Sequence, residues 1–178
     1  MENTLKLIET LEKTPNSKKI LQLIKLVENE SSVDITKQLD QLMGVWELRW
    51  SSSKSPFLNY SPLLDNLQIL DLEVNRGLNF LGPKGFLGKF LATIILAELD
   101  IINQKRTNVA FKKAGIIGPR LLGKNICFLS EIKTQKGWLD ATVLTNKLRV
   151  CRGYKGTTFA LLKRDNLSIA DFFNQIKN

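Results

Sequence analysis

The sequence predicts a mainly β domain in which about eight antiparallel strands curl into a barrel, with an N-terminal helical cap and a short C-terminal helix. Three observations carry this prediction. Apolar residues follow a helical period up to residue 42, alternate with polar residues from Gly44, and return to a helical period near the C-terminus. No linker separates these parts, so we expect one domain over residues 1–178, comprising the cap (1–42), the barrel (44–164) and the terminal helix (168–177).

The first 42 residues have the pattern of short amphipathic helices. Residues 3–30 predict two helices that are broken at residues 15–17, where Asn16 or Ser17 is a suitable N-cap. Residues 35–43 predict a short third helix, because apolar residues recur there at helical spacing. The cap is nearly neutral, with six Lys against seven Asp and Glu in residues 1–40.

From Gly44 the apolar period becomes two, which is typical of strands. Eight segments show it: 44–50, 66–74, 95–102, 107–113, 125–133, 137–144, 147–153 and 157–164. Short turns such as residues 103–105 and 153–156 join them, and Ser168 is a suitable N-cap for the terminal helix. An eight-stranded barrel is about the smallest that either fills its interior with side chains or holds one small ligand.

Composition excludes several classes of function. The chain has no histidine, so it lacks the usual general base and the usual ligand of zinc and haem. We therefore expect no metal, no cofactor and no catalysis. Cys127 and Cys151 have no metal-binding spacing and are expected as free buried thiols. The longest apolar run, residues 91–97, is too short to span a membrane.

The positive charge is concentrated in the predicted barrel. Residues 41–178 hold twenty Lys and Arg against ten Asp and Glu, and residues 105–124 hold six basic residues and no acid. A basic surface of this kind favours an anionic partner, either nucleic acid or an anionic lipid surface. Solubility alone is the alternative.

Two stretches combine glycine, proline, lysine and apolar residues: "FLGPKGFLGKF" (80–90) and "IIGPRLLGKN" (116–125). Their glycines and prolines favour loops, and we expect the two loops to dock peripherally on an anionic membrane. The alternative is a pair of loops folded over one end of the barrel. The expected docking residues are Lys84, Phe86, Leu87, Lys89, Lys112, Lys113, Ile116, Ile117, Arg120, Leu121, Leu122 and Lys124.

Strand alternation also predicts the interior of the barrel. The inward residues able to line an apolar ligand, in part, are expected to be Trp46, Leu48, Leu72, Leu99, Val109, Phe111, Phe128 and Val150. A filled core is the alternative. The sequence "GVW" opening the first strand, with an arginine on a late strand, resembles the lipocalin arrangement, which implies an Arg across the Trp46 ring. Arg149 and Arg152 both qualify, and because Arg152 shares the face of Leu148 and Val150, we expect Arg152 there.

Two separated motifs resemble the plastid lipid-associated protein family, also called fibrillins or plastoglobulins. They are "LMGVWELRWSSS" (42–53) and "GWLDATVLTNKLRVCRGYKGTTFALLKRD" (137–165), in the family's order and spacing. The resemblance implies a non-catalytic, lipid-associated protein of photosynthetic membranes, linked to photoprotection, that binds or shields a carotenoid, quinone or acyl lipid. It also implies association with thylakoids, or a cytoplasmic place, in a cyanobacterium, and a plastid in a eukaryote. The N-terminus has no pattern of a signal or transit peptide, which favours the cyanobacterial type.

Two other functions stay open alongside an interaction module. A nucleic-acid-binding barrel would use the basic strands, but its aromatic residues are expected to alternate inward, so we expect no nucleic acid. An enzyme acting on a lipid-soluble pigment or quinone would have Asp140 and Glu98 as its acid–base candidates. The sequence does not determine the oligomeric state.

Overall fold

The computed structural model describes residues 1–55, 58–85, 91–121 and 124–176, and the side chains of residues 120, 121, 124 and 125 lie outside this description. The elements in chain order are α1 (Glu2–Lys13), α2 (Ile20–Glu30), α3 (Leu39–Leu42), β1 (Gly44–Ser51), β2 (Leu64–Asp71), β3 (Arg76–Pro83), β4 (Ala92–Ile101), β5 (Arg106–Leu121), β6 (Lys124–Leu144), β7 (Leu148–Gly153), β8 (Thr158–Lys163) and α4 (Ile169–Phe173).

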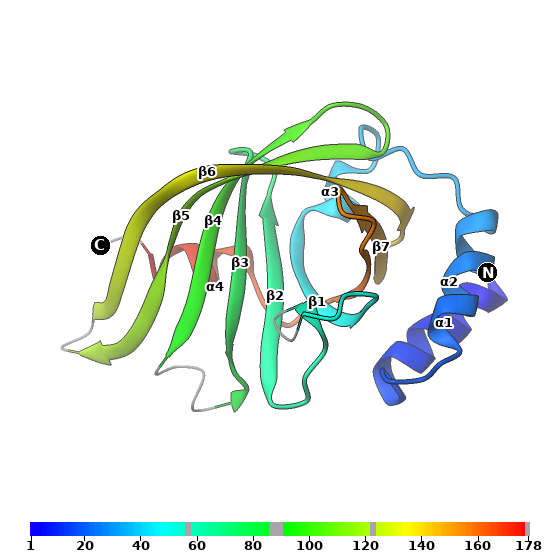
Figure 1. The fold of residues 1–178 in the computed structure, drawn as a ribbon, viewed down its shortest axis with the longest axis horizontal. Helices are drawn as coiled ribbons and strands as arrows, with labels where there is room; N and C mark the ends of the chain where they lie inside the picture. Colours follow the sequence, from blue (N-terminus) through cyan, green and yellow to red (C-terminus); the bar gives the residue numbers. More distant parts are fainter. Residues whose placement is uncertain (56–57, 86–90, 122–123, 177–178) are drawn as a thin grey trace.

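The eight strands form a closed antiparallel ring. Each strand pairs with the next one in the sequence, and β1 also pairs with β8 (Figure 1). The predicted mainly β class, with eight antiparallel strands, N-terminal helices and a short C-terminal helix, is therefore confirmed. The likeness to a lipocalin stays a prediction.

Antiparallel connections alternate between the two ends of the ring. The β1–β2, β3–β4, β5–β6 and β7–β8 connections lie at one end, which we call the hairpin end. The opposite end carries α3 and the β2–β3, β4–β5 and β6–β7 connections, and we call it the α3 end (Figure 1). Both glycine- and proline-containing stretches therefore lie toward the hairpin end, where they include the ends of β3 and β5.

The predicted strand boundaries were partly wrong. Strand β3 was not predicted, and its residues 80–83 were assigned to a loop because Gly82 and Pro83 were taken as turn residues, whereas they end a strand of eight residues. Residues 125–133 and 137–144 form one strand, β6, because residues 134–136 between them are also extended. Residues 66–74 also overran β2, since Asn75, with φ 52°, belongs to the turn into β3.

Most of the second glycine- and proline-containing stretch lies in strands and not in a loop, because residues 116–121 belong to β5 and residues 124–125 to β6. Strand β5 runs through Gly115, Gly118 and Pro119 to Leu121 and pairs with β6 along its length. Gly115 fits there because an added Cβ would lie 1.9 Å from the Phe128 carbonyl oxygen. Register shifts on either side, at 111/113 and 117/120, bend this long hairpin.

The N-terminal helices cover a side of the ring. Leu7, Leu11 and Ile24 pack against Leu148 and Val150 of β7, and α1 and α2 lie beside this part of the ring in Figure 1. The predicted N-caps Asn16 and Ser17 were wrong, because a turn intervenes and Lys19 occupies the N-cap position of α2.

The C-terminal helix covers another part of the outer surface. Phe172 and Phe173 of α4 pack with outward-facing residues of β2, β3 and β4 such as Ile69 and Ile94. The predicted N-cap Ser168 is confirmed. Its hydroxyl accepts the Asp171 amide and the Asp171 carboxylate accepts the Ser168 amide, which forms a capping box.

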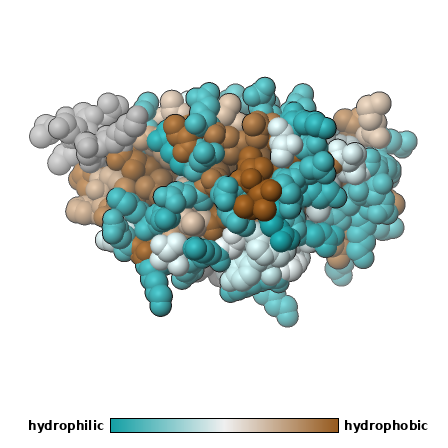
Figure 2. Space-filling view, turned by 90° about the horizontal axis from the view of Figure 1, so that it is seen from above, coloured by the Kyte–Doolittle hydropathy of each residue, from teal (hydrophilic) through white to brown (hydrophobic). Residues whose placement is uncertain are grey.

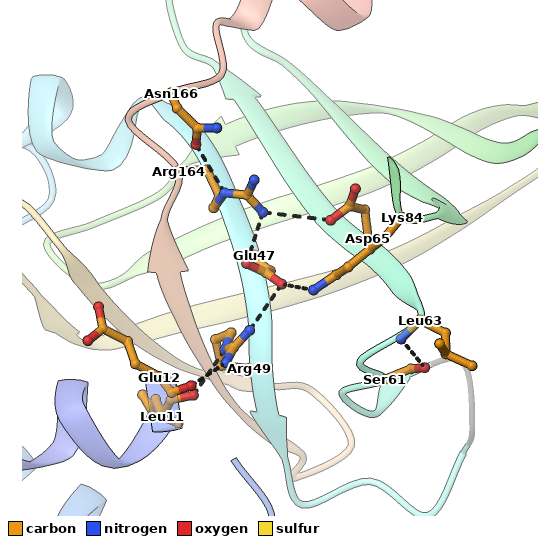
Figure 3. A network of polar contacts seen from close by, with 10 residues as sticks. All are labelled: Leu11, Glu12, Glu47, Arg49, Ser61, Leu63, Asp65, Lys84, Arg164 and Asn166. Atoms are coloured by element: carbon orange, nitrogen blue, oxygen red, sulfur yellow. Dashed lines mark hydrogen bonds and ion pairs between the residues drawn. The ribbon is translucent and has the colours of Figure 1, made fainter. Parts of the chain in front are cut away.

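A buried carboxylate ties β1 to four other segments. Glu47 accepts Lys84 Nζ at 2.9 Å and Arg49 Nη1 at 3.2 Å on one oxygen, and Arg164 Nη1 at 3.1 Å on the other (Figure 3). Arg49 also donates to the carbonyl oxygens of Leu11 and Glu12, at the end of α1. Arg164 Nη1 lies 3.6 Å from Asp65 of β2.

These cations determine the ionisation of Glu47. Burial by itself would raise its pKa, but the hydrogen bond and charge of Lys84 and the charges of Arg49 and Arg164 lower the pKa below its ordinary value of 4.5. A lowered folded pKa means that ionised Glu47 stabilises the fold above about pH 4.5. That stabilisation is lost as the pH falls through the folded pKa.

We predict that Glu47→Gln destabilises the fold by roughly 2–3 kcal/mol at pH 7, because it leaves three cations without their shared counter-charge. This is less than the ~3–5 kcal/mol of a fully buried pair, since Lys84 and Arg164 are partly exposed. Urea unfolding should show a smaller difference from the native chain at pH 3. Glu9→Gln, which removes an exposed pair with Lys13, is the control and should change stability little at either pH. An equal loss for Glu47→Gln at both pH values would contradict the electrostatic role.

Candidate ligand-binding site

A cavity of about 230 Å³ lies inside the ring. Its walls are mostly apolar side chains that the strands point into the ring. They include Leu70 of β2, Ala97 and Leu99 of β4, Val109 and Phe111 of β5, Leu139 of β6 and Phe159 of β8. Leu58, Tyr154 and Lys155 belong to connections at the hairpin end and complete the lining there. The cavity suits a predominantly apolar ligand.

The α3 end of the ring is closed around Trp46. The indole is 0% exposed, and its Nε1 donates to the Leu42 carbonyl oxygen at 2.8 Å. Val33, Ile35 and Leu42, from the segment before β1, pack in the same cluster. Gly44, with φ 130°, leaves room for Lys163, because a Cβ there would lie 2.7 Å from the Lys163 Cε.

Two cations lie against the Trp46 ring, and neither is Arg152. Arg149 Cζ is 5.0 Å and Lys163 Nζ is 5.2 Å from the ring centroid. Arg152 instead pairs with Glu28 of α2 at 2.6 Å. The prediction of Arg152 was therefore wrong, and the alternative Arg149 occupies the position.

Arg152 was chosen because the face of β7 that carries Leu148 and Val150 was taken as the inner one, whereas this face packs against the helices. Leu148 and Val150 point outward into the cluster with α1 and α2, so Val150 does not line the interior as predicted. Arg149 and Cys151 point inward instead. The apolar alternation was correctly identified, but it marks the helix-covered outer face.

The other predicted lining residues divide into three groups. Leu99 and Val109 line the large cavity and a neighbouring small one, Phe111 lines the large one and Leu72 the small one. Leu48 is buried in the cluster around Trp46. Phe128 was wrongly placed inside, because its side chain is 71% exposed near the end of the β5–β6 hairpin. Whether any of them binds a ligand stays a prediction.

The expected docking residues also behave differently from one another. Ile116 is 47% exposed, but Ile117 is 5% exposed and packs in the cluster with α4, so it is not available to a membrane. Lys84 is held by Glu47, while Lys112 and Lys113 are surface residues paired with Glu98 and Glu131. Arg120, Leu121 and Lys124 lie in strands without described side chains, and Phe86, Leu87, Lys89 and Leu122 lie outside the described residues.

The two acid–base candidates lie on the surface and apart from the cavity lining. Asp140 accepts two hydrogen bonds of 2.7 Å from Arg106, whose guanidinium also lies over Trp138. Glu98 pairs with Lys112 at 2.9 Å. In the described part of the chain no group of three or more His, Cys, Asp or Glu side chains is arranged to hold a metal ion. Cys127 and Cys151 are free thiols, and burial raises the pKa of both.

Sequence reasoning missed several lining residues. Gln68 and Gly77 line the large cavity. Arg149 lines the small one, although the residues on either side of it in the sequence, Leu148 and Val150, are apolar. Alternation in the sequence shows that Arg149 points to the face opposite Leu148 and Val150, but it does not show which of the two faces is inside.

A protein-family model described as PAP_fibrillin matches residues 6–162. The chain belongs to this family. The predicted resemblance to fibrillins is thus confirmed, and membership of the PAP_fibrillin family points to a plastid-type lipid-associated protein. The searches of curated proteins and of solved structures returned no match. None of the helices in the described part of this PAP_fibrillin chain has the length and apolar composition needed to cross a bilayer.

We predict that Trp46→Ala destabilises the fold by about 3–5 kcal/mol, because it opens a cavity at the closed end and removes both cation–π contacts. Thermal or urea unfolding measures this loss. Trp138→Ala is the matched control, since Trp138 is only half-buried, and it should cost about 1 kcal/mol or less. A loss below about 1 kcal/mol for Trp46→Ala would contradict its role in closing the ring.

Proposed function

We propose that the protein binds a predominantly apolar lipid in the ring cavity and docks peripherally on an anionic photosynthetic membrane, without catalysing a reaction. The cavity of about 230 Å³, with its apolar walls, is the observation that carries the proposal. Membership of the PAP_fibrillin family supports lipid association. A carotenoid, a quinone or an acyl lipid would enter the cavity with part of its apolar chain.

Two arguments support docking through the hairpin end. Ile116 and Phe128 are cross-strand partners near the end of the β5–β6 hairpin, and both side chains are exposed. Leu91, the residue before β4, is also exposed, and β4 is the strand that pairs with the other side of β5. Figure 2, which views the molecule from the side opposite the hairpin end, shows hydrophobic side chains in the middle and at the left of that face and mostly hydrophilic ones at the right. The net charge of +9 favours an anionic surface as the partner.

The other two functions have less support. Arg106 and Asp140 pair with each other, so the acid–base candidate Asp140 is held in a surface ion pair and is not among the residues that line the cavity. The half-exposed Trp138 is covered on one face by the same arginine, which leaves less of its ring for stacking with a nucleic-acid base. We therefore propose lipid as the partner and not nucleic acid.

We predict that Ala97→Phe weakens binding of a quinone with a ten-carbon tail by at least tenfold, because the added ring fills the cavity that Ala97 lines. Tryptophan fluorescence during titration measures the affinity, and circular dichroism checks that the variant is folded. Ala110→Phe is the matched control, because Ala110 lies on the outer face of the neighbouring strand β5. A folded native chain that shows no saturable binding would overturn the cavity proposal.

We predict that Ile116→Ser with Phe128→Ser reduces flotation with anionic liposomes by about tenfold at every salt concentration, because two exposed apolar side chains no longer enter the interface. Leu5→Ser with Leu21→Ser removes exposed apolar residues from α1 and α2 and should leave flotation unchanged. Lys112→Glu with Lys113→Glu should act mainly at low salt. Unchanged flotation of the first pair, with the fold intact, would rule out docking through this hairpin.

A further inference from the structure

Arg149 is a buried cation without a counter-charge. Its residue is 3% exposed, and its Nη2 donates to Gln68 Oε1 of β2. Its Nε has no hydrogen-bond partner among the described residues. Within the described chain no Asp or Glu lies within ion-pair distance of it, whereas Arg49, Arg106, Arg152 and Arg164 all have carboxylate partners.

The guanidinium lies beside the apolar cavity. Arg149 lines a small cavity of about 30 Å³, which shares Leu70, Leu99, Val109 and Leu139 with the cavity of about 230 Å³. Gln68, the partner of Arg149, lines the large cavity itself. The charge is therefore found at the inner end of the apolar space, on the side of Trp46 and the α3 end.

An uncompensated buried charge disfavours the folded state, and arginine cannot relieve it by losing its proton. Burial lowers the pKa of Arg149, but a guanidinium stays ionised in proteins. The nearby Cys151 is no counter-ion, since burial raises the pKa of its thiol and keeps it neutral. The Trp46 ring and the Gln68 oxygen satisfy only part of this group, and they leave the Nε donor for a further acceptor.

We propose that the cavity recognises an amphipathic monocarboxylate, such as a fatty acid, whose carboxylate accepts the Arg149 Nε while its apolar tail lies along Leu70, Leu99, Val109 and Phe111. This rests on the proposed function, that the ring cavity holds a lipid. A space of about 30 Å³ admits a group of the size of a carboxylate and is small for a substituted phosphate. Charge-assisted hydrogen bonds in a water-poor site favour the anion over a neutral head group.

The test compares head groups on one tail. Dodecanoate, dodecanol, methyl dodecanoate and dodecyl phosphate, each below its micelle concentration, are titrated into the native chain by calorimetry, with acetate as the tail-free anion. We expect dodecanoate to bind about 10- to 100-fold more tightly than dodecanol or the ester. Acetate should not bind measurably. Because the pair is buried, the preference should persist in 1 M NaCl, unlike attraction to surface lysines.

Variants assign the preference to Arg149. Arg149→Met should bind dodecanoate and dodecanol equally, and it should be as stable as the native chain, or more so, since it removes an unpaired buried charge. Arg152→Met is the matched control, because Arg152 faces α2 on the outer side, and it should keep the preference. Arg149→Gln is a second variant of similar polarity, and the comparison of ligands on the native chain stands if neither variant folds.

The outcomes separate the two proposals. Equal binding of dodecanoate and dodecanol by the native chain overturns the carboxylate proposal and leaves the apolar cavity intact. Tighter binding of dodecyl phosphate than of dodecanoate also overturns it. If Arg149→Met still binds dodecanoate more tightly than dodecanol, another residue recognises the carboxylate, and the assignment to Arg149 is overturned. No binding of any tailed ligand overturns both proposals.

Discussion

Strand β1 carries the constraint on which the structure depends, because it pairs with β2 on one side and β8 on the other and so closes the ring. Successive side chains of a strand point to opposite faces. In β1 this sends Trp46 inward and Glu47 outward, and each becomes the centre of a buried cluster. Two adjacent residues of one strand are therefore the centres of the apolar cluster inside the ring and of the polar network outside it.

The two clusters differ in whether their buried charges are paired. Outside the ring, Glu47 neutralises cations from β1, from the end of β3 and from the residue after β8, so burial of these groups is offset by their mutual attraction (Figure 3). Inside, the buried Arg149 lies over the Trp46 ring, and no carboxylate among the described residues pairs with it. Lys163 also lies over this ring, but it is partly exposed at the α3 end and donates to the carbonyl oxygens of Asp40 and Gln41. Arg149 is thus an unpaired positive charge in a largely apolar interior.

The antiparallel order also relates the cavity to the surface of the molecule. The α3 end is closed by the segment before β1, which packs on Trp46, whereas the hairpin end carries the residues Leu58, Tyr154 and Lys155 of the cavity lining. The long β5–β6 hairpin reaches this same end with Ile116 and Phe128 exposed. In the proposed function, a membrane met by the hairpin would thus face the end of the ring where these three residues line the cavity.

The sequence by itself determined the class of the fold, because periods of 3.6 and 2 are local and the change at Gly44 is sharp. It also determined the Ser168 cap and the family, whose motifs are contiguous. Leu99, Val109 and Phe111 face the cavities as alternation predicted, because polar residues such as Asp100, Asn108 and Lys112 alternate with them. Leu72 lines the small cavity from the turn after β2.

Only the tertiary structure decided which face of β7 is inside and where the long strands end. Both faces of β7 are buried, one by helices and one by the ring, so alternation identifies two faces without saying which is inner. Phe128 lies on the inner side of the alternation but beyond the closed part of the ring, which leaves it exposed. Arg149 is inside for a reason that no local pattern contains: α1 and α2 cover the opposite face.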